Sequence, residues 1–228
     1  MTDKELYKSL SYETKSVYET ADENTLKAIF AFNEGYLEFL DEGKTERECV
    51  EVAERQALEN GFVKLDEKEE LKAGDKIYTI NRNKNILLAV IGSEDIENGI
   101  NLVGAHIDSP RVDLKQNPLY EDSGLALLKT HYYGGIKKYQ WTAIPLAMHG
   151  VMYTKNGEKV NICIGEDEND PVFCITDLLP HLAKDQMVKK MTEGVEGESL
   201  NILVGGMGIQ SEDVSEKVKF NILKMLNE

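Results

Sequence analysis

The pattern of apolar residues changes at Pro110, and this change limits the folds that the chain can adopt. Before Pro110, helix-like segments alternate with strand-like segments. After it, short apolar segments recur between turn residues, with one helix-like stretch at residues 177–190. Alternating helices and strands followed by closely spaced strands indicate an α/β fold with a β-rich second part.

Two helices are predicted in the first part. In residues 22–40, apolar side chains recur every three or four positions and share one helical face: Leu26, Ile29, Phe30, Leu37 and Leu40. The stretch 45–48, Thr-Glu-Arg-Glu, forms a capping box that starts the second helix, and Asn60-Gly61 ends it. Gly43 ends the first of these two helices.

Strands follow in the same part. Residues 76–81 and 85–91 are two strand-like runs joined by a short turn, which is typical of an antiparallel hairpin. Residues 100–105 form a short apolar run that we interpret as a buried strand. That strand would place His106 at the end of a sheet, where ligands commonly bind.

The second part is predicted from short apolar runs and a final helix. The predicted strands lie within 125–128, 141–148, 151–154, 160–164, 172–175 and 200–204. From about residue 215 the apolar side chains again fall on one helical face, which predicts an amphipathic helix at the end of the sequence.

Charge and composition exclude some functions. With 41 acidic and 26 basic residues, the 228-residue chain has a net charge of −15, which disfavours nucleic acid and anionic membrane as partners. No apolar run approaches the ~18 residues of a membrane span, and the first residues lack a signal-peptide pattern. Three scattered cysteines fit a reducing compartment. We therefore expect a cytoplasmic protein.

The sharpest short motif is Gly-Ala-His-Ile-Asp-Ser-Pro at residues 104–110. In an extended chain, His106 and Asp108 point to the same side. A neutral imidazole binds zinc well, and a neighbouring carboxylate can orient it. A histidine that merely forms local hydrogen bonds in a loop is the alternative, because this spacing alone is a weak signal.

Other polar motifs carry less chemistry. His131 precedes Tyr132-Tyr133-Gly134-Gly135, which fits either an aromatic-rimmed loop or a turn between strands, and His149 fits a hairpin. By its pattern alone, His181 fits a structural or surface histidine better than a functional one. The acidic stretch 166–170 and the glycines at 205–208 are predicted to be turns. No motif for covalent nucleophilic catalysis is present.

Longer segments resemble a known family. They are residues 101–111 (NLVGAHIDSPR), 118–122 (PLYED), 129–136 (KTHYYGGI), 170–173 (DPVF) and 177–183 (DLLPHLA). In this order, they are similar to the aspartyl aminopeptidase family of co-catalytic zinc exopeptidases, and to its bacterial members above all. Because the segments span most of the chain, chance similarity is a poor explanation.

The resemblance implies a role for several residues. His106 would be a zinc ligand, Asp108 the carboxylate that orients it, and His181 a histidine at or near the active site. Residues 1–113 would be the N-terminal part of the catalytic domain, and 114–228 a dimerisation insert. The family forms dimers that build dodecamers and removes N-terminal, typically acidic, residues from peptides with a free N-terminus.

The sequence also departs from the family pattern. The bridging aspartate, the glutamate pair, a further carboxylate ligand and the last histidine of the family would all follow the insert. One histidine ligand cannot hold two zinc ions. We therefore expect this chain to be the N-terminal half of an aminopeptidase and inactive by itself. The alternative is a non-catalytic assembly module or fragment without metal.

Overall fold

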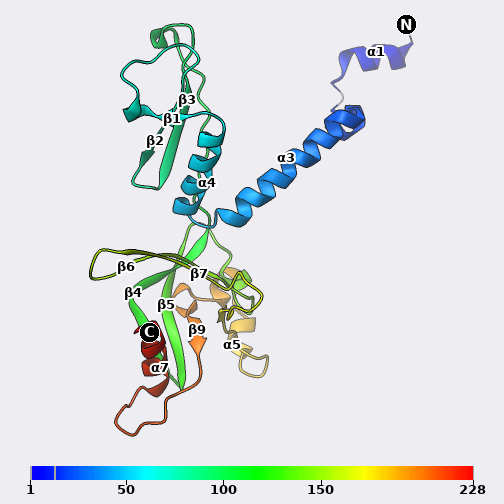
Figure 1. The fold of residues 1–228 in the computed structure, drawn as a ribbon. Helices are drawn as coiled ribbons and strands as arrows, with labels where there is room; N and C mark the ends of the chain where they lie inside the picture. Colours follow the sequence, from blue (N-terminus) through cyan, green and yellow to red (C-terminus); the bar gives the residue numbers. More distant parts are fainter. Residues whose placement is uncertain (1, 13, 228) are drawn as a thin grey trace. The chain divides into compact units, whose positions relative to one another are not determined.

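The computed structural model describes residues 2–12 and 14–227, and it has the α/β architecture expected from the sequence (Figure 1). The chain divides into two compact units, Met1–Ala105 and His106–Glu228. The division falls between Ala105 and His106, within the motif at residues 104–110. That residues 114–228 serve as a dimerisation insert stays a prediction.

Helices of the first unit begin where the sequence places caps. The side chain of Asp22 accepts a hydrogen bond from the amide of Thr25, and Thr45 and Glu48 form the predicted capping box. Gly43 ends the first of these two helices, as expected. The helices are α1 (Asp3–Leu10), α2 (Val17–Thr20), α3 (Glu23–Glu42) and α4 (Glu46–Glu59).

A three-stranded sheet completes this unit, in the order β1-β2-β3. Its strands are β1 (Val63–Lys64), β2 (Lys76–Asn81) and β3 (Asn85–Val90), and the short 3-10 helices η1 (Leu65–Glu67) and η2 (Ile96–Asn98) flank them. The predicted hairpin is confirmed, because β2 and β3 pair antiparallel around Arg82 and Asn83. Both turn residues have positive φ, 54° and 53°, as a tight hairpin turn requires. The core comprises Cys49, Val50, Val52, Ala57, Ile77 and Tyr78.

The strand predicted at residues 100–105 is wrong. These residues form no strand, and Leu102 and Val103 are 80% and 95% exposed. A strand needs neighbours for its backbone hydrogen bonds, and the described chain pairs none with this run.

The second unit is built on a four-stranded antiparallel sheet in the order β4-β5-β9-β8 (Figure 1). A separate hairpin pairs β6 with β7. The strands are β4 (Arg111–Asp122), β5 (Leu125–Tyr133), β6 (Met148–Tyr153), β7 (Lys159–Ile164), β8 (Cys174–Ile175) and β9 (Ile202–Gly205). The helical elements are η3 (Lys138–Gln140), α5 (Lys184–Met187), α6 (Met191–Gly194), η4 (Gly197–Ser199) and α7 (Lys217–Asn227).

The core of this unit is formed by apolar side chains of strands β5, β8 and β9 and of the segment that precedes β9. Its buried cluster is Leu128, Ile175, Val195, Leu200 and Ile202. Helix α7 contacts β4, β5 and β9 and buries Val218. The Glu121 carboxylate on β4 accepts hydrogen bonds from the amides of Val218 and Lys219, both at 2.9 Å. A carboxylate there satisfies the first-turn amides and favours the helix dipole.

Most predicted elements of the second unit are confirmed, including the final helix. Several differ in extent, and two of them differ most. Residues 141–148 make only isolated bridges, at Thr142 and Leu146, before β6 begins, and the helical stretch at 177–190 shortens to the four residues of α5. Within the described residues, no helix combines the length and apolarity needed to cross a bilayer.

Candidate metal centre

His106 and Asp108 lie in an irregular segment that leads directly into β4. The ring nitrogen Nδ1 of His106 is 2.9 Å from the main-chain oxygen of Asp108 and 3.5 Å from its carboxylate oxygen Oδ1. A carbonyl oxygen can only accept a hydrogen bond, so Nδ1 of His106 is the donor. In this tautomer of the neutral ring, the lone pair of Nε2 is available to bind a metal ion. The His106 side chain is 83% exposed. The geometry therefore suits one metal ligand whose other nitrogen is fixed by its own loop.

Tyr133, the last residue of β5, contacts the carboxylate of Asp108. The Tyr133 hydroxyl donates a hydrogen bond to Oδ2 of Asp108 at 3.2 Å. The Arg111 guanidinium lies over the Tyr133 ring, 4.2 Å from its centroid, and Arg111 Nε donates to Asp113 at 2.7 Å. These contacts follow from the strand register, which pairs Arg111 with Tyr133. Sequence reasoning missed Tyr133 and Arg111, because only the pairing of β4 with β5 brings them to the motif.

The other histidines are placed differently. His131 lies opposite Asp113 across the same strand pair, with Nε2 3.9 Å from the Asp113 carboxylate. His131 and the tyrosines after it therefore belong to a strand, and Gly134 turns the chain with a φ of 77°. His149 lies in the β6–β7 hairpin, as predicted, and its Nε2 is 2.9 Å from Glu166.

His181 lies in an exposed turn between β8 and α5. The amides of Leu182 and Ala183 both donate to the carbonyl of Leu179 and close this turn. No described contact joins His181 to His106. Its assignment as a site residue therefore stays a prediction that the arrangement within one chain does not test.

A zinc site needs more ligands than the described residues bring together. Across residues 2–12 and 14–227, no group of three or more histidine, cysteine or carboxylate side chains is placed to hold a metal ion. His106 fits one position of a zinc site, whereas structural and catalytic zinc sites use at least three protein ligands. The described residues alone therefore do not form a zinc centre.

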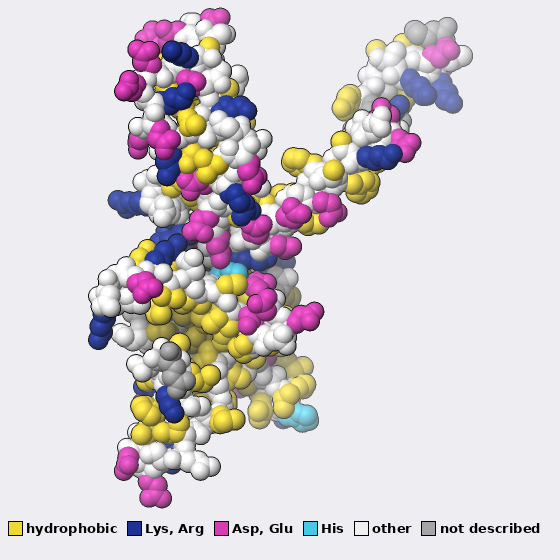
Figure 2. All heavy atoms as spheres, in the orientation of Figure 1, with side chains coloured by type: hydrophobic (Ala, Val, Ile, Leu, Met, Phe, Trp, Pro, Cys, Tyr) yellow, Lys and Arg dark blue, Asp and Glu magenta, His cyan; other side chains and the backbone are white. Residues whose placement is uncertain are grey.

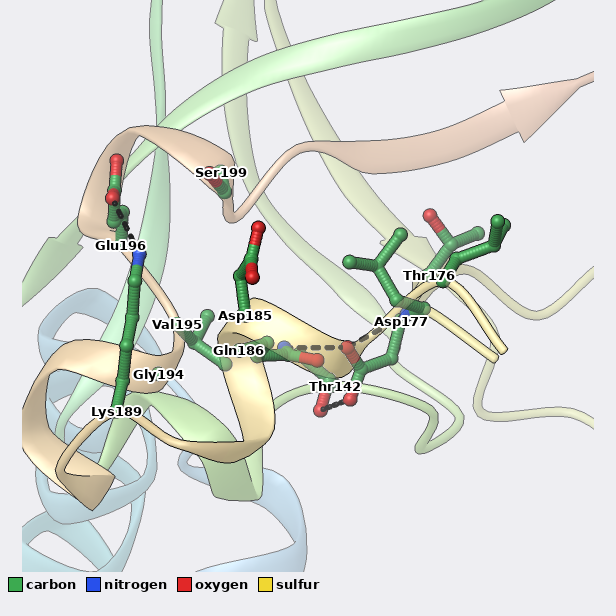
Figure 3. A pocket seen from close by; sticks show the side chains of 12 residues that line it. Thr142, Thr176, Asp177, Asp185, Gln186, Lys189, Gly194, Val195, Glu196 and Ser199 are labelled. Carbon is green, nitrogen blue, oxygen red and sulfur yellow. Dashed lines mark hydrogen bonds and ion pairs between the residues drawn. The ribbon is translucent and has the colours of Figure 1, made fainter. Parts of the chain in front are cut away.

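A separate cavity of about 510 Å³ lies beside α5 and α6 (Figure 3). On its wall, Asp177 accepts hydrogen bonds from Gln186, from the amide of Leu178 and from Thr142, at 2.8 to 3.3 Å. These bonds, led by that from Gln186, lower the pKa of Asp177. Lys189 pairs with Glu196 at 3.4 Å across the same cavity. The polar groups mostly satisfy one another, which favours a structural role.

The acidic stretch 166–170 is a turn, as predicted. Asp170 accepts a hydrogen bond from the amide of Gly165 at 2.8 Å, which closes the turn after β7. Gly165 has a φ of 104°, which favours glycine.

Comparison with known proteins identifies the family. The sequence model of the family described as aminopeptidase I zinc metalloprotease (M18) matches residues 39–228. The chain therefore belongs to the M18 family of aminopeptidases, whose metal is zinc.

Bacterial relatives match along nearly the whole chain. The probable M18 family aminopeptidase 1 of Clostridium acetobutylicum is 49% identical over 220 residues, covering 95% of this chain and 47% of the relative. That of Thermotoga maritima is 47% identical over 204 residues, covering 88% and 44%. The chain thus spans about half the length of the curated relatives that it matches.

Solved structures agree with this assignment. The M18 aminopeptidase crystal structure from Thermotoga maritima has a TM-score of 0.88 at 44% identity, covering 95% of this chain and 47% of that one. Aminopeptidase I from Clostridium acetobutylicum has a TM-score of 0.84 at 43% identity, covering 96% and 49%. The S. cerevisiae mApe1 dodecamer, at 21% identity and a TM-score of 0.56, covers 79% and 39% and shares the fold alone.

Proposed function

We propose that this chain supplies part of the active site of a zinc-dependent aminopeptidase that removes acidic N-terminal residues from peptides. In this proposal His106 is a zinc ligand and Asp108 orients it. The observation that carries the proposal is the hydrogen bond from His106 Nδ1 to its own loop, which leaves Nε2 for a metal. Membership in a zinc peptidase family supports the same role.

Activity in this proposal depends on groups that the described residues do not assemble. Because one histidine cannot hold a pair of zinc ions, the 228 residues are expected to be inactive alone. His181, which lies in an exposed turn, is proposed as a second site histidine that acts in an assembled homo-oligomer in the cytoplasm. The remaining ligands and the general base would come from sequence equivalent to the unmatched half of the relatives.

The test is reconstitution. The chain is purified alone and together with the unmatched half of the Clostridium acetobutylicum relative, expressed separately. Zinc content and cleavage of aspartyl, glutamyl and leucyl test peptides are then measured. We expect little zinc and no cleavage for the chain alone, and zinc with cleavage of the acidic peptides for the mixture.

His106→Ala and His131→Ala give a matched pair of variants. His106→Ala should abolish zinc-dependent cleavage in the mixture, whereas His131→Ala should retain it, since Nε2 of His131 faces Asp113 in the strand pair. Tight binding of two zinc ions and cleavage by the chain alone would refute the predicted inactivity. Equal zinc content in the mixture with and without His106 would refute the ligand assignment.

A non-catalytic assembly module is the second candidate. The absence of any three-ligand group among the described residues favours it. A chain of this kind would form defined oligomers in sedimentation experiments, and its reconstituted mixture would carry no zinc at His106.

A further inference from the structure

His181 is carried by a short turn whose apolar side chains face solvent. Leu178, Leu179 and Leu182 are 53%, 67% and 71% exposed, and His181 is exposed as well. Figure 2 shows hydrophobic side chains on the surface around α5, the helix that follows the turn. Of residues 178–183, only Ala183 is buried. Burial of apolar surface therefore does little to hold this turn in one conformation.

Asp177 connects the two ends of the turn. Its Oδ1 atom accepts a hydrogen bond from the amide of Leu178 at 2.8 Å, where the turn begins. The same atom accepts a hydrogen bond at 3.0 Å from Nε2 of Gln186, which lies nine positions further along the chain, on α5. In Figure 3 the carboxylate of Asp177 points toward Gln186 and Thr142. One carboxylate oxygen thus links the start of the turn to the helix after it.

The second carboxylate oxygen links the turn to the sheet. Oδ2 of Asp177 lies 3.3 Å from the hydroxyl of Thr142, which is also 3.2 Å from the carbonyl of Tyr139. Thr142 forms a bridge to Ile175 in β8, and the amide of Ala143 donates to the Ile175 carbonyl at 2.8 Å. The contacts of Asp177 therefore join the turn to a segment that is itself held by β8.

The effect of these contacts is local. An ionised carboxylate only accepts hydrogen bonds, and Asp177 receives three donors on its two oxygens. The side chain is exposed, so water competes for the same positions and each bond contributes little to the free energy of unfolding. Asp177 thus restricts the turn more than it stabilises the unit as a whole.

We propose that Asp177 is a positioning residue, which fixes the turn at residues 178–183 and thereby the direction in which the chain presents His181. A turn that is already ordered loses less conformational entropy when it enters an assembled site. The inference rests on the proposed function in that His181 is treated as a site histidine of the assembled homo-oligomer.

Two substitutions of Asp177 and one control test the proposal. Asp177→Ala removes both acceptor oxygens. Asp177→Asn is the conservative variant, because its amide oxygen still accepts from Leu178 and Gln186 and its amide nitrogen can donate to the Thr142 hydroxyl. Asp167→Ala makes the same change as the first variant at an exposed aspartate in the turn after β7, and it is the matched control.

Backbone ¹⁵N relaxation of the full 228-residue chain is the first measurement. For the amides of residues 181–183 we expect order parameters of about 0.85 in the original chain, in Asp177→Asn and in the control. In Asp177→Ala they should fall below about 0.6. The urea midpoint should stay the same, so that the loss of order is local. Unchanged order parameters in Asp177→Ala, or an equal loss in the control, would overturn the proposal.

Cleavage of the acidic test peptides by the mixture with the second half of the Clostridium acetobutylicum relative is the second measurement. Asp177→Ala should lower kcat/KM by about 10- to 100-fold, and Asp177→Asn should retain most of it. Because Asp177 acts through His181, Asp177→Ala should cause no further loss in a His181→Ala background. A further loss of the same size in that background would overturn the proposal.

The two proposals fail in different ways. If His181→Ala leaves cleavage unchanged while Asp177→Ala releases the turn, the role of His181 in the proposed function is refuted and the restriction of the turn by Asp177 stands. If His181→Ala abolishes cleavage while Asp177→Ala changes neither the order parameters nor cleavage, positioning by Asp177 is refuted and the role of His181 stands. The relaxation measurement requires no active mixture.

Discussion

Tyr133 donates a hydrogen bond to the Asp108 carboxylate over a distance of 3.2 Å, and so connects the end of β5 to the segment that carries His106. Arg111 supports the tyrosine ring from the first residue of β4, 4.2 Å from the ring centroid. The sheet thereby restricts a segment that has no secondary structure of its own. This link makes Tyr133 a positioning residue in any site that uses His106.

Tyr133→Phe should weaken zinc binding in the reconstituted protein by about 2- to 10-fold, because it removes one hydrogen bond to Asp108 and leaves the ring in place. Zinc affinity is measured by competition with a chromophoric chelator. Tyr132→Phe is the control, since Tyr132 points to the other face of the strand, near Lys138. An equal effect of both substitutions would contradict the positioning role.

Thr130→Val should destabilise the second unit by about 1–3 kcal/mol. Thr130 is only 1% exposed, and its hydroxyl donates to the carbonyl of Leu200, which is itself fully buried. Valine has a similar shape but no donor, so the buried carbonyl would lose its partner. Urea unfolding measures the change. Thr79→Val, on the exposed side of β2, should change the stability little.

The elements that were predictable from the sequence depend on contacts a few residues apart. The capping box of Thr45 and Glu48 and the turn at Arg82 and Asn83 are examples. Strand β4 could not be predicted, because polar residues and Pro118 interrupt its apolar pattern. Its strand conformation depends instead on the hydrogen bonds of its pairing with β5.

In the candidate site too, the contacts between residues close in sequence were predictable and the contacts made through strand pairing were not. His106 and Asp108 are two positions apart and were readable as a motif, whereas Tyr133 reaches Asp108 across 25 positions. For residues 100–105 the local pattern predicted a strand that the structure does not contain. An apolar pattern forms a strand only where another strand satisfies its backbone groups.

Tyr78 should ionise at a higher pH in the folded chain than in the unfolded chain. Burial, reinforced by the hydrogen bond from its hydroxyl to Glu54 at 2.8 Å, raises the pKa of Tyr78 to about 12. The unfolded chain would ionise near pH 10. The contribution of this group to stability is therefore complete below pH 10 and is lost as the pH rises towards 12.

Ultraviolet absorbance at 295 nm follows this ionisation, and urea midpoints between pH 9 and 11 follow the stability. Tyr78→Phe should remove the late step and flatten the fall in stability above pH 10, at a cost of about 1 kcal/mol at neutral pH. Tyr36→Phe, at an exposed position on α3, should leave both unchanged. A full tyrosine titration below pH 11 in the folded chain would contradict the assignment.

The ring of His106 should be held as the Nδ1–H tautomer by the backbone rather than by the Asp108 carboxylate. The main-chain oxygen of Asp108 lies 2.9 Å from Nδ1, closer than the carboxylate oxygen at 3.5 Å. Asp108→Ala keeps that carbonyl, so we expect the variant to keep the tautomer. Long-range ¹H–¹⁵N correlation spectra at pH 8, where histidine is mostly neutral, distinguish the two tautomers.

Asp108→Ala should nevertheless lower the zinc affinity of the reconstituted protein by about 10- to 100-fold, because the carboxylate increases the basicity of the ligand. A change to the Nε2–H tautomer in this variant would show that the carboxylate, and not the carbonyl, orients the ring. An unchanged tautomer with reduced zinc affinity would separate the two roles. The backbone would then set the direction of Nε2, and the carboxylate would set its affinity for the metal.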